Sequence, residues 1–383
     1  MIYEKSYRDV AMLSLRLVIK MKKKNICCMA MLVIMLLSLA ACGSRTADTG
    51  DYVTHNVNAD NENMNASVQT PGTVTGNPVP AGADAPMSDD AQPANDDASG
   101  APVVYFTSDI SADGLVKIYE KLDWEPTGNL AVKVSTGEPP ASNYLRQELI
   151  GQLVTSLNGT YVECLTAYGG QRSTVAMAKQ VAEDHGFAPF ELLDENGSMT
   201  LNVSNYSVIA ENYVGAGMAN YDSMLVLSHF KGHAMAGFGG AIKNISIGLG
   251  SAEGKAWIHS GGKSRTNPWG GDQIDFTESM AEAASTVQDY YGDRIVYINV
   301  MNRLSVDCDC DGNPAEPDIH DIGILASYDP VALDQACVGL VYQAEGNASL
   351  VKRIESKQGV HTLEHAEEIG LGSRTYELVD IDE

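Results

Sequence analysis

Histidines, lysines and glycines gather in residues 228–259, where their spacing is suited to binding or catalysis. His229 and His233 lie four residues apart, so on a helix they would share one face and bind one cation. The glycines let backbone N–H groups approach an anion, and the lysines add positive charge. The alternative is a glycine-rich turn whose histidines are hydrogen-bonded to the backbone. The segment predicts a metal- or anion-binding site, with His233 and Lys243 as catalytic candidates, Lys231, Gly239, Gly240 and Asn244 as ligand-binding candidates, and His229 and His259 as metal ligands.

A second candidate site is the acidic, cysteine-containing segment 307–321, which begins Asp-Cys-Asp-Cys-Asp. A Cys-x-Cys pair with carboxylates and a nearby imidazole can bind a divalent metal ion, whose identity the sequence leaves open. A disulfide between the two cysteines and a solvated acidic turn are the alternatives. No iron–sulfur cluster is expected, because only Cys164 and Cys337 remain to complete four thiolates. The candidate metal ligands here are Asp307, Cys308, Cys310 and His320.

Two shorter motifs are less specific. His361–His365 matches the inverted zincin pattern His-x-x-Glu-His, but few residues follow it to supply a distant acidic ligand. We therefore predict a solvated helix there. Residues 168–173 are expected to form either an anion-holding turn or a plain turn with Ser173 as the N-cap of the next helix.

The composition limits the classes of function. The 383 residues include 25 Lys and Arg against 50 Asp and Glu, a net charge of −25. Such an acidic chain is not expected to bind nucleic acid, because phosphate recognition needs concentrated positive charge. With 44% hydrophobic and 20% charged residues the chain can bury a core. Seven cysteines are too few for a disulfide scaffold of this length.

The N-terminal region predicts export and lipidation. Lysines at 22–24 precede an apolar run, Ile26–Ala41, that is short for a membrane span. Leu39–Cys42 resembles the bacterial lipobox, so residues 1–41 are predicted to be a lipoprotein signal peptide, with Met21 as the true start. Lipidation of Cys42 would anchor the protein to the membrane outside the cytoplasm. Residues 42–101 are predicted to be a disordered acidic linker.

Residues 102–383 are predicted to form an α/β domain, a largely parallel sheet with helices on both faces, in one body or two lobes. Asp329-Pro330 indicates a helix start, an N-cap followed by proline. Ligand sites in such sheets lie at the carboxyl ends of the strands. The expected strands are Val103–Thr107, Leu130–Ser135, Ser223–Leu227, Arg294–Val300 and Ile322–Ser327, and the expected helices are Ala112–Leu122, Tyr144–Leu157, Thr174–Asp184, Glu278–Tyr291, Pro330–Tyr342 and Thr362–Ile369.

The folded part, roughly Val103 to Asp382, resembles the prokaryotic family known as domain of unknown function 362. The resemblance rests on Thr-Ala-Tyr-Gly-Gly at 166–170, the histidine–glycine run at 228–244, Asp-Cys-Asp-Cys at 307–310, and residues 321–334. It implies a fold but no reaction. Some relatives carry a ferredoxin-type cluster domain, whose cysteines this chain lacks.

A motif-level resemblance is to nickel-dependent lactate racemases. In those enzymes a histidine is followed after ten residues by a lysine that tethers a nickel pincer cofactor, and after sixteen more by a metal-binding histidine. His233, Lys243 and His259 have these spacings, so the resemblance implies proton transfer, cofactor attachment and metal binding, respectively. The chain lacks the racemases' Gly-x-His-Arg stretch, and its signal is of the type that exports unfolded chains without a preloaded cofactor.

Together these features predict a lipid-anchored extracytoplasmic protein with a metal- or anion-binding site that acts on a small anionic substrate. Two alternatives stay open. One is a non-catalytic lipoprotein that binds a ligand or partner, and the other is racemase-like proton or hydride transfer on a 2-hydroxy acid. The sequence does not decide whether the chain is an enzyme.

Overall fold

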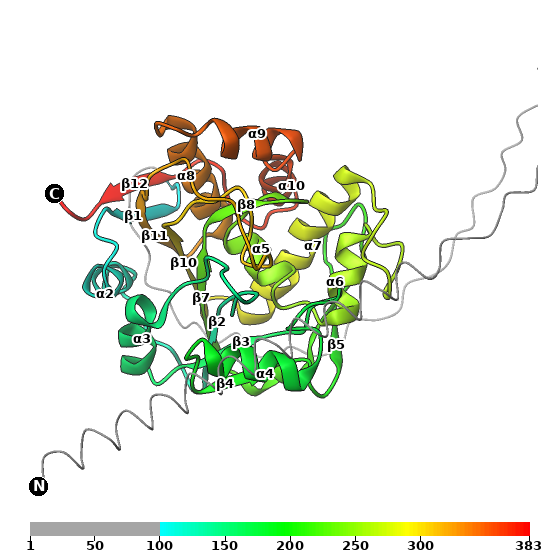
Figure 1. Ribbon diagram of the computed structural model, residues 1–383. Helices are drawn as coiled ribbons and strands as arrows, with labels where there is room; N and C mark the ends of the chain where they lie inside the picture. Colours follow the sequence, from blue (N-terminus) through cyan, green and yellow to red (C-terminus); the bar gives the residue numbers. More distant parts are fainter. Residues whose placement is uncertain (1–99) are drawn as a thin grey trace, which may run out of the picture. The chain divides into compact units, whose positions relative to one another are not determined.

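The computed structural model describes residues 100–383, which fold around one eight-stranded sheet (Figure 1). The strand order is β12-β1-β11-β10-β7-β2-β3-β4. Neighbouring strands are parallel except where β11 runs against β1 and β10, so the predicted, largely parallel sheet is confirmed. The strands are β1 (Val103–Thr107), β2 (Leu130–Lys133), β3 (Thr160–Glu163), β4 (Phe190–Leu192), β7 (Ser223–His229), β10 (Ile295–Met301), β11 (Gly323–Ser327) and β12 (Glu377–Asp380).

Helices cover both faces of the sheet, as predicted (Figure 1). Along β7, Leu225 and Leu227 point into a core closed by α2 and α3, whereas Met224 and Val226 point into a core that includes α5, α7 and α8. The described residues belong to one compact unit, so no division into two lobes is found among them. The helices are α2 (Ala112–Lys121), α3 (Gln147–Ser156), α4 (Val175–Asp184), α5 (Ala241–Ser246), α6 (Ala252–His259), α7 (Gln273–Tyr291), α8 (Pro330–Gln343), α9 (Ala348–Ser356) and α10 (His361–Glu368).

The helix start predicted at Asp329-Pro330 is confirmed. The Asp329 carboxylate accepts hydrogen bonds from the backbone N–H groups of Val331 and Ala332, and Pro330 takes the first helical position of α8. None of the helices within residues 100–383 is long and apolar enough to cross a bilayer. The predicted signal peptide, Cys42 and nearly all of the predicted linker lie outside the described residues.

The glycine-rich segment 231–239 forms a β-hairpin and not a helix. β8 (Lys231–His233) pairs with β9 (Gly237–Gly239), so His229 and His233 do not share a helical face, and that expectation is wrong. Gly232 is the reason that β8 packs closely on the loop after β10, because a Cβ there would lie 2.3 Å from the Val306 carbonyl oxygen. This contact brings the two candidate segments of the sequence together. A further hairpin joins β5 (Ser198–Asn202) and β6 (Glu211–Gly215).

Candidate functional site

A cavity of about 80 Å³ opens at the carboxyl ends of β2, β3 and β7. This is the edge at which parallel sheets commonly bind ligands, and it holds the predicted histidine–glycine segment. We call it the lysine cavity, because its charged lining consists of Lys133, Lys231, Lys243, Lys255 and Arg172 against Glu163 and Asp309. Five cationic side chains face two carboxylates here, in a chain whose net charge is −25.

Three of the lysines, Lys133, Lys231 and Lys255, are held by protein oxygens. Lys133 Nζ donates to Asn244 Oδ1 at 3.0 Å, and Lys255 Nζ donates to the Gly250 carbonyl at 2.6 Å. Burial lowers the pKa of Lys133 to about 8. Asn244, predicted to bind ligand, lines the cavity and also positions Lys133.

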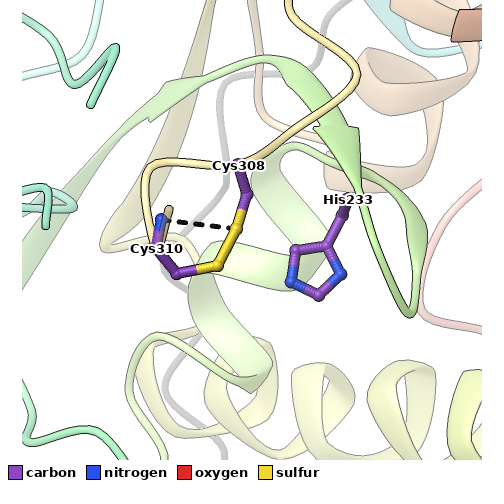
Figure 2. Close-up of side chains that lie close together, drawn as sticks. All are labelled: His233, Cys308 and Cys310. Carbon is purple, nitrogen blue, oxygen red and sulfur yellow. Dashed lines mark hydrogen bonds between the residues drawn. A yellow bond between two sulfur atoms is a disulfide. The ribbon is translucent and has the colours of Figure 1, made fainter. Parts of the chain in front are cut away.

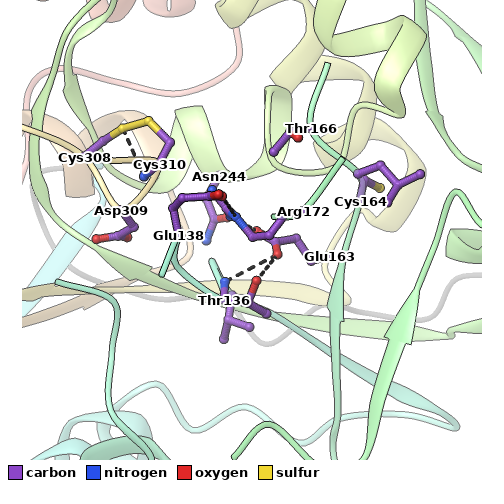
Figure 3. Close-up of polar contacts among 12 residues, drawn as sticks. Thr136, Glu138, Glu163, Cys164, Thr166, Arg172, Asn244, Cys308, Asp309 and Cys310 are labelled. Carbon is purple, nitrogen blue, oxygen red and sulfur yellow. Dashed lines mark hydrogen bonds and ion pairs between the residues drawn. A yellow bond between two sulfur atoms is a disulfide. The ribbon is translucent and has the colours of Figure 1, made fainter. Parts of the chain in front are cut away.

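Arg172 reaches the cavity from the turn at residues 168–173. Its guanidinium lies between two carboxylates, 3.0 Å from Glu138 and 3.2 Å from Glu163 (Figure 3). The Thr136 hydroxyl donates to the same Glu163 carboxylate. The N-cap of α4 is Thr174, one residue later than the Ser173 of the alternative prediction. The turn therefore contributes a cation that is already paired.

Lys243 differs from the other cations of the cavity. Its Nζ has no hydrogen-bond or ion-pair partner among residues 100–383. Burial, reinforced by the charge of Lys231, lowers the pKa of Lys243 to about 7. Gly239 gives this side chain room, because a Cβ there would lie 3.2 Å from Lys243 Cδ. An unpaired ammonium in a cationic cavity is the environment that favours an anion.

Asp309 organises one wall of the cavity. Its carboxylate lies 2.7 Å from His229 Nδ1 and 2.9 Å from Lys231 Nζ, and all three side chains are buried. Although burial opposes ionisation, Lys231 and His229 hold the pKa of Asp309 well below its usual range. His229 Nε2 contacts the Asn302 carbonyl at 2.7 Å. Both ring nitrogens of His229 therefore have oxygen partners, and neither is open to a metal ion in this arrangement.

His233 and His259 carry their protons on opposite sides of the ring. His233 Nδ1 accepts from the backbone N–H groups of Met235 and Ala236, so the proton of the neutral ring lies on Nε2. His259 Nδ1 lies 2.7 Å from the Lys255 carbonyl, so it carries the proton and Nε2 keeps its lone pair. Burial lowers the pKa of both rings, that of His259 to about 4, and the charge of Lys243 adds to this in each case. A donor ring and an acceptor ring thus both feel the charge of Lys243, although neither His233 nor His259 lines the lysine cavity.

The family described as "Domain of unknown function (DUF362)" matches residues 130–339. The chain belongs to this family. The match is narrower than the expected Val103–Asp382, but it runs from β2 into α8 and includes every residue that lines the lysine cavity.

Among solved structures, the DUF362 chain is similar to the lactate racemase apoprotein from Thermoanaerobacterium thermosaccharolyticum. The likeness has a TM-score of 0.39 and 13% sequence identity, and it covers 62% of this chain. The chain spans little more than half of that racemase, 56% of its length. No curated protein matches the chain.

The acidic cysteine segment of the DUF362 chain is arranged differently from the predicted metal site. Cys308 and Cys310 are joined by a disulfide, which was the first alternative (Figure 2). Asp307 accepts from the backbone N–H of Ala315 and pairs with Arg353 at 3.4 Å. His320 is exposed on the surface. The predicted set of metal ligands is therefore not assembled.

Two other groups of metal-ligating atoms occur among the described residues, each within 4.8 Å: His233 with Cys308 and Cys310, and Glu278 with Glu282 and His365. In the first group the two sulfur atoms are bonded to each other, and His233 Nε2 carries the ring proton, so none of the three is available as a metal ligand in this state. The first group contains two of the predicted metal ligands, Cys308 and Cys310, and the second contains none of them. A metal of unidentified kind stays a prediction.

The second group belongs to the packing of α10 on α7. His361 lies 3.0 Å from Glu278, and His365 lies 3.2 Å from Glu282. Glu282 is fully buried and also accepts backbone hydrogen bonds from Ser207, Val208 and Ile209. The predicted solvated helix is wrong, because the histidines of the His-x-x-Glu-His pattern face buried or half-buried glutamates across a helix interface.

Gly240, predicted to bind ligand, lines the cavity and also shapes the start of α5. A Cβ on Gly240 would lie 2.2 Å from Asp334 Oδ1. The Asp334 carboxylate accepts from the backbone N–H groups of Ala241 and Ile242 and from the Asn299 side chain. Burial raises the pKa of Asp334 to about 6. Glycine is needed at position 240 because the buried carboxylate of Asp334, a residue of α8, occupies the space beside it and caps the N-terminus of α5.

Sequence reasoning missed Lys133, Glu163 and Asp309 as site residues. Lys133 and Glu163 are the last residues of β2 and β3, so their place at the carboxyl ends of strands was the available signal. Asp309 lay inside the predicted acidic segment, but nothing in the sequence separated it from Asp307. Only the packing of the loop against β8 shows which carboxylate turns inward.

Proposed function

We propose that this DUF362 protein binds a small anion, with a carboxylate or phosphate group, in the lysine cavity. The observation that carries the proposal is the Nζ of Lys243, which lines the cavity without a partner among the described residues. Repulsion from the neighbouring cations and burial make this ammonium costly in the empty cavity. A bound anion would supply the missing counter-charge and a charge-assisted hydrogen bond.

The size and lining of the cavity favour a small ligand. About 80 Å³ accommodates an anion of a few heavy atoms but not a nucleotide. The cations lie on separate elements, with Lys133 at the end of β2, Lys231 on β8 and Lys243 on α5. Cations from more than one side can therefore contact an anion that has several oxygens, such as a carboxylate or a phosphate.

Calorimetric titration with phosphate, sulfate, lactate and malonate tests the proposal. We expect one-to-one binding of at least one of these anions. The affinity should fall as the pH rises from about 6 to about 8, because Lys243 loses its proton near its pKa of about 7. Absence of binding by all four anions, or binding that does not change with pH, would contradict an anion site built on Lys243.

Catalysis is a second candidate function, favoured by the opposite protonation of His233 and His259. A base with a free Nε2 and an acid with a protonated Nε2, near one ammonium, is the arrangement required to move a proton at the carbon next to a carboxylate. Exchange of the 2-hydrogen of lactate for deuterium in heavy water is the measurement. If the 2-hydrogen of lactate exchanges and the exchange is lost in His259→Phe, racemase-like chemistry is supported. If an anion binds but the 2-hydrogen of lactate does not exchange, the alternative of a non-catalytic binding protein is supported.

We also propose that the protein is exported and anchored by a lipid on Cys42. The lipobox-like Leu39–Cys42 supports this, and the Cys308–Cys310 disulfide is of a kind that persists outside the cytoplasm. Metabolic labelling with a palmitate analogue is expected to label the protein, whereas Cys42→Ala should lose both the label and membrane association. Labelling that survives this substitution would contradict the anchor.

A further inference from the structure

The Cys308–Cys310 disulfide forms part of the wall of the lysine cavity. Both cysteines line it, together with Lys231 and Lys243. Cys308 is 5% exposed, whereas Cys310 is only partly buried. Cys310 is therefore the more accessible of the two residues.

Groups that stabilise a sulfur anion surround this disulfide. A ring nitrogen of His233 lies within 4.8 Å of both sulfur atoms, and Figure 2 shows the ring beside them. Because His233 Nδ1 accepts from two backbone N–H groups, the proton of this neutral ring is on Nε2. The backbone N–H of Cys310 donates to Cys308 Sγ at 3.3 Å. This hydrogen bond and the lysines of the cavity favour a thiolate at Cys308 over a neutral thiol.

The two other cysteines among the described residues, Cys164 and Cys337, lie in environments that keep the thiol protonated. Cys164 also lines the cavity, but its thiol donates to the Leu249 carbonyl at 3.3 Å, which holds the proton on sulfur. Cys337 is a residue of α8 that is fully buried in the core; the Asn299 side chain donates to its sulfur at 3.4 Å, but burial raises the pKa of this thiol. Proximity to the lysines alone, or a hydrogen bond to sulfur alone, therefore does not make a thiolate, and Cys308 combines the two.

We propose that Cys308 and Cys310 form a redox-active pair that exchanges with small thiols entering the lysine cavity. A thiolate attacks Cys310 Sγ, the Cys308–Cys310 bond breaks, and its electron pair leaves on Cys308 Sγ. A second thiolate attacks the sulfur of the bound thiol, releases it as a small disulfide and leaves a thiolate on Cys310. In sum, two thiols are oxidised to one disulfide, and the protein disulfide is reduced to two thiols.

Two cysteine variants of the protein test which sulfur is attacked, with the small, uncharged disulfide of 2-mercaptoethanol as the probe. In Cys308→Ser the remaining Cys310 thiol should form a 2-mercaptoethanol adduct, measured by intact mass, at least tenfold faster than the Cys308 thiol of Cys310→Ser, because Cys310 is the more exposed residue. Equal rates in the two folded variants, or no adduct on either, would overturn the proposal. Circular dichroism establishes that both variants are folded.

The electrostatic part of the proposal is tested by redox equilibrium in buffers of 2-mercaptoethanol and its disulfide, followed by alkylation and mass measurement. Lys243→Met is expected to shift the equilibrium at least tenfold toward the disulfide, which is about 30 mV for a two-electron couple. Lys263→Met is the control, because Lys263 is exposed and pairs with Asp275 at 2.9 Å. An equilibrium within twofold of the unsubstituted protein in Lys243→Met would overturn it. Neither measurement requires an anion to bind, so the result is independent of the proposed function.

Discussion

Asp309→Ala is expected to lower the free energy of unfolding by about 3–5 kcal/mol, the usual cost of breaking a buried ion pair by removing one partner. The carboxylate is 2% exposed and faces His229 at 2.7 Å and Lys231 at 2.9 Å. Without it, a buried imidazole and a buried ammonium lose their only carboxylate among the described residues. Urea denaturation monitored by circular dichroism measures the difference.

The effect should depend on pH in a defined direction. Because the pKa of Asp309 is lowered in the folded protein, its contribution is present above about pH 4, near the carboxyl's ordinary pKa, and is lost as the pH falls. The two proteins should therefore differ less in acid than at neutral pH. Asp311→Ala is the matched control, because Asp311 is exposed two residues away, and it should change stability by no more than about 0.5 kcal/mol. An Asp309→Ala protein within about 1 kcal/mol of the unsubstituted one would show that the carboxylate does not organise this wall.

Lys243→Met is expected to weaken anion binding by about tenfold to a hundredfold, the loss of a hydrogen bond to a charged group worth about 1.5–3 kcal/mol. The same substitution should raise the free energy of unfolding. The pKa of Lys243 is lowered to about 7 in the folded protein, so protonating this side chain at neutral pH costs stability that methionine does not. Loss of affinity with a gain in stability is the pattern of a residue kept for binding.

Calorimetry and urea denaturation of Lys243→Met measure the two effects side by side. Lys263→Met again serves as the control, because it removes an exposed lysine that already has a carboxylate partner, and it should leave both quantities nearly unchanged. Anion affinity retained in Lys243→Met would remove this residue from the site. A loss of stability in the same variant would mean that the ammonium has a structural role.

The elements that the sequence predicted well are those with strong local signals. Val103–Thr107 was predicted with the bounds of β1, and the N-cap and proline at 329–330 marked the start of α8. The three-residue strands β8 and β9 were missed, because their glycines carry no alternation and their pairing depends on the turn between them. The hairpin then set the positions of both histidines, which local spacing alone placed wrongly on a helix.

The candidate site was predicted in part. Lys231, Lys243 and the glycines at 239 and 240 do line one cavity, since they belong to one continuous segment. Lys133, Glu163 and Asp309 come from three distant segments, which meet only when β2 pairs with β3 in the sheet and the loop after β10 packs against β8. No periodicity marks them, so their convergence could not be obtained from spacing.

The most direct test of the account is a crystal structure of the protein grown with the anion that binds most tightly in the calorimetric titration. We predict the anion inside the lysine cavity, within hydrogen-bond distance of Lys243 Nζ. An anion bound only on the protein surface, with the cavity empty at a saturating concentration, would contradict the account.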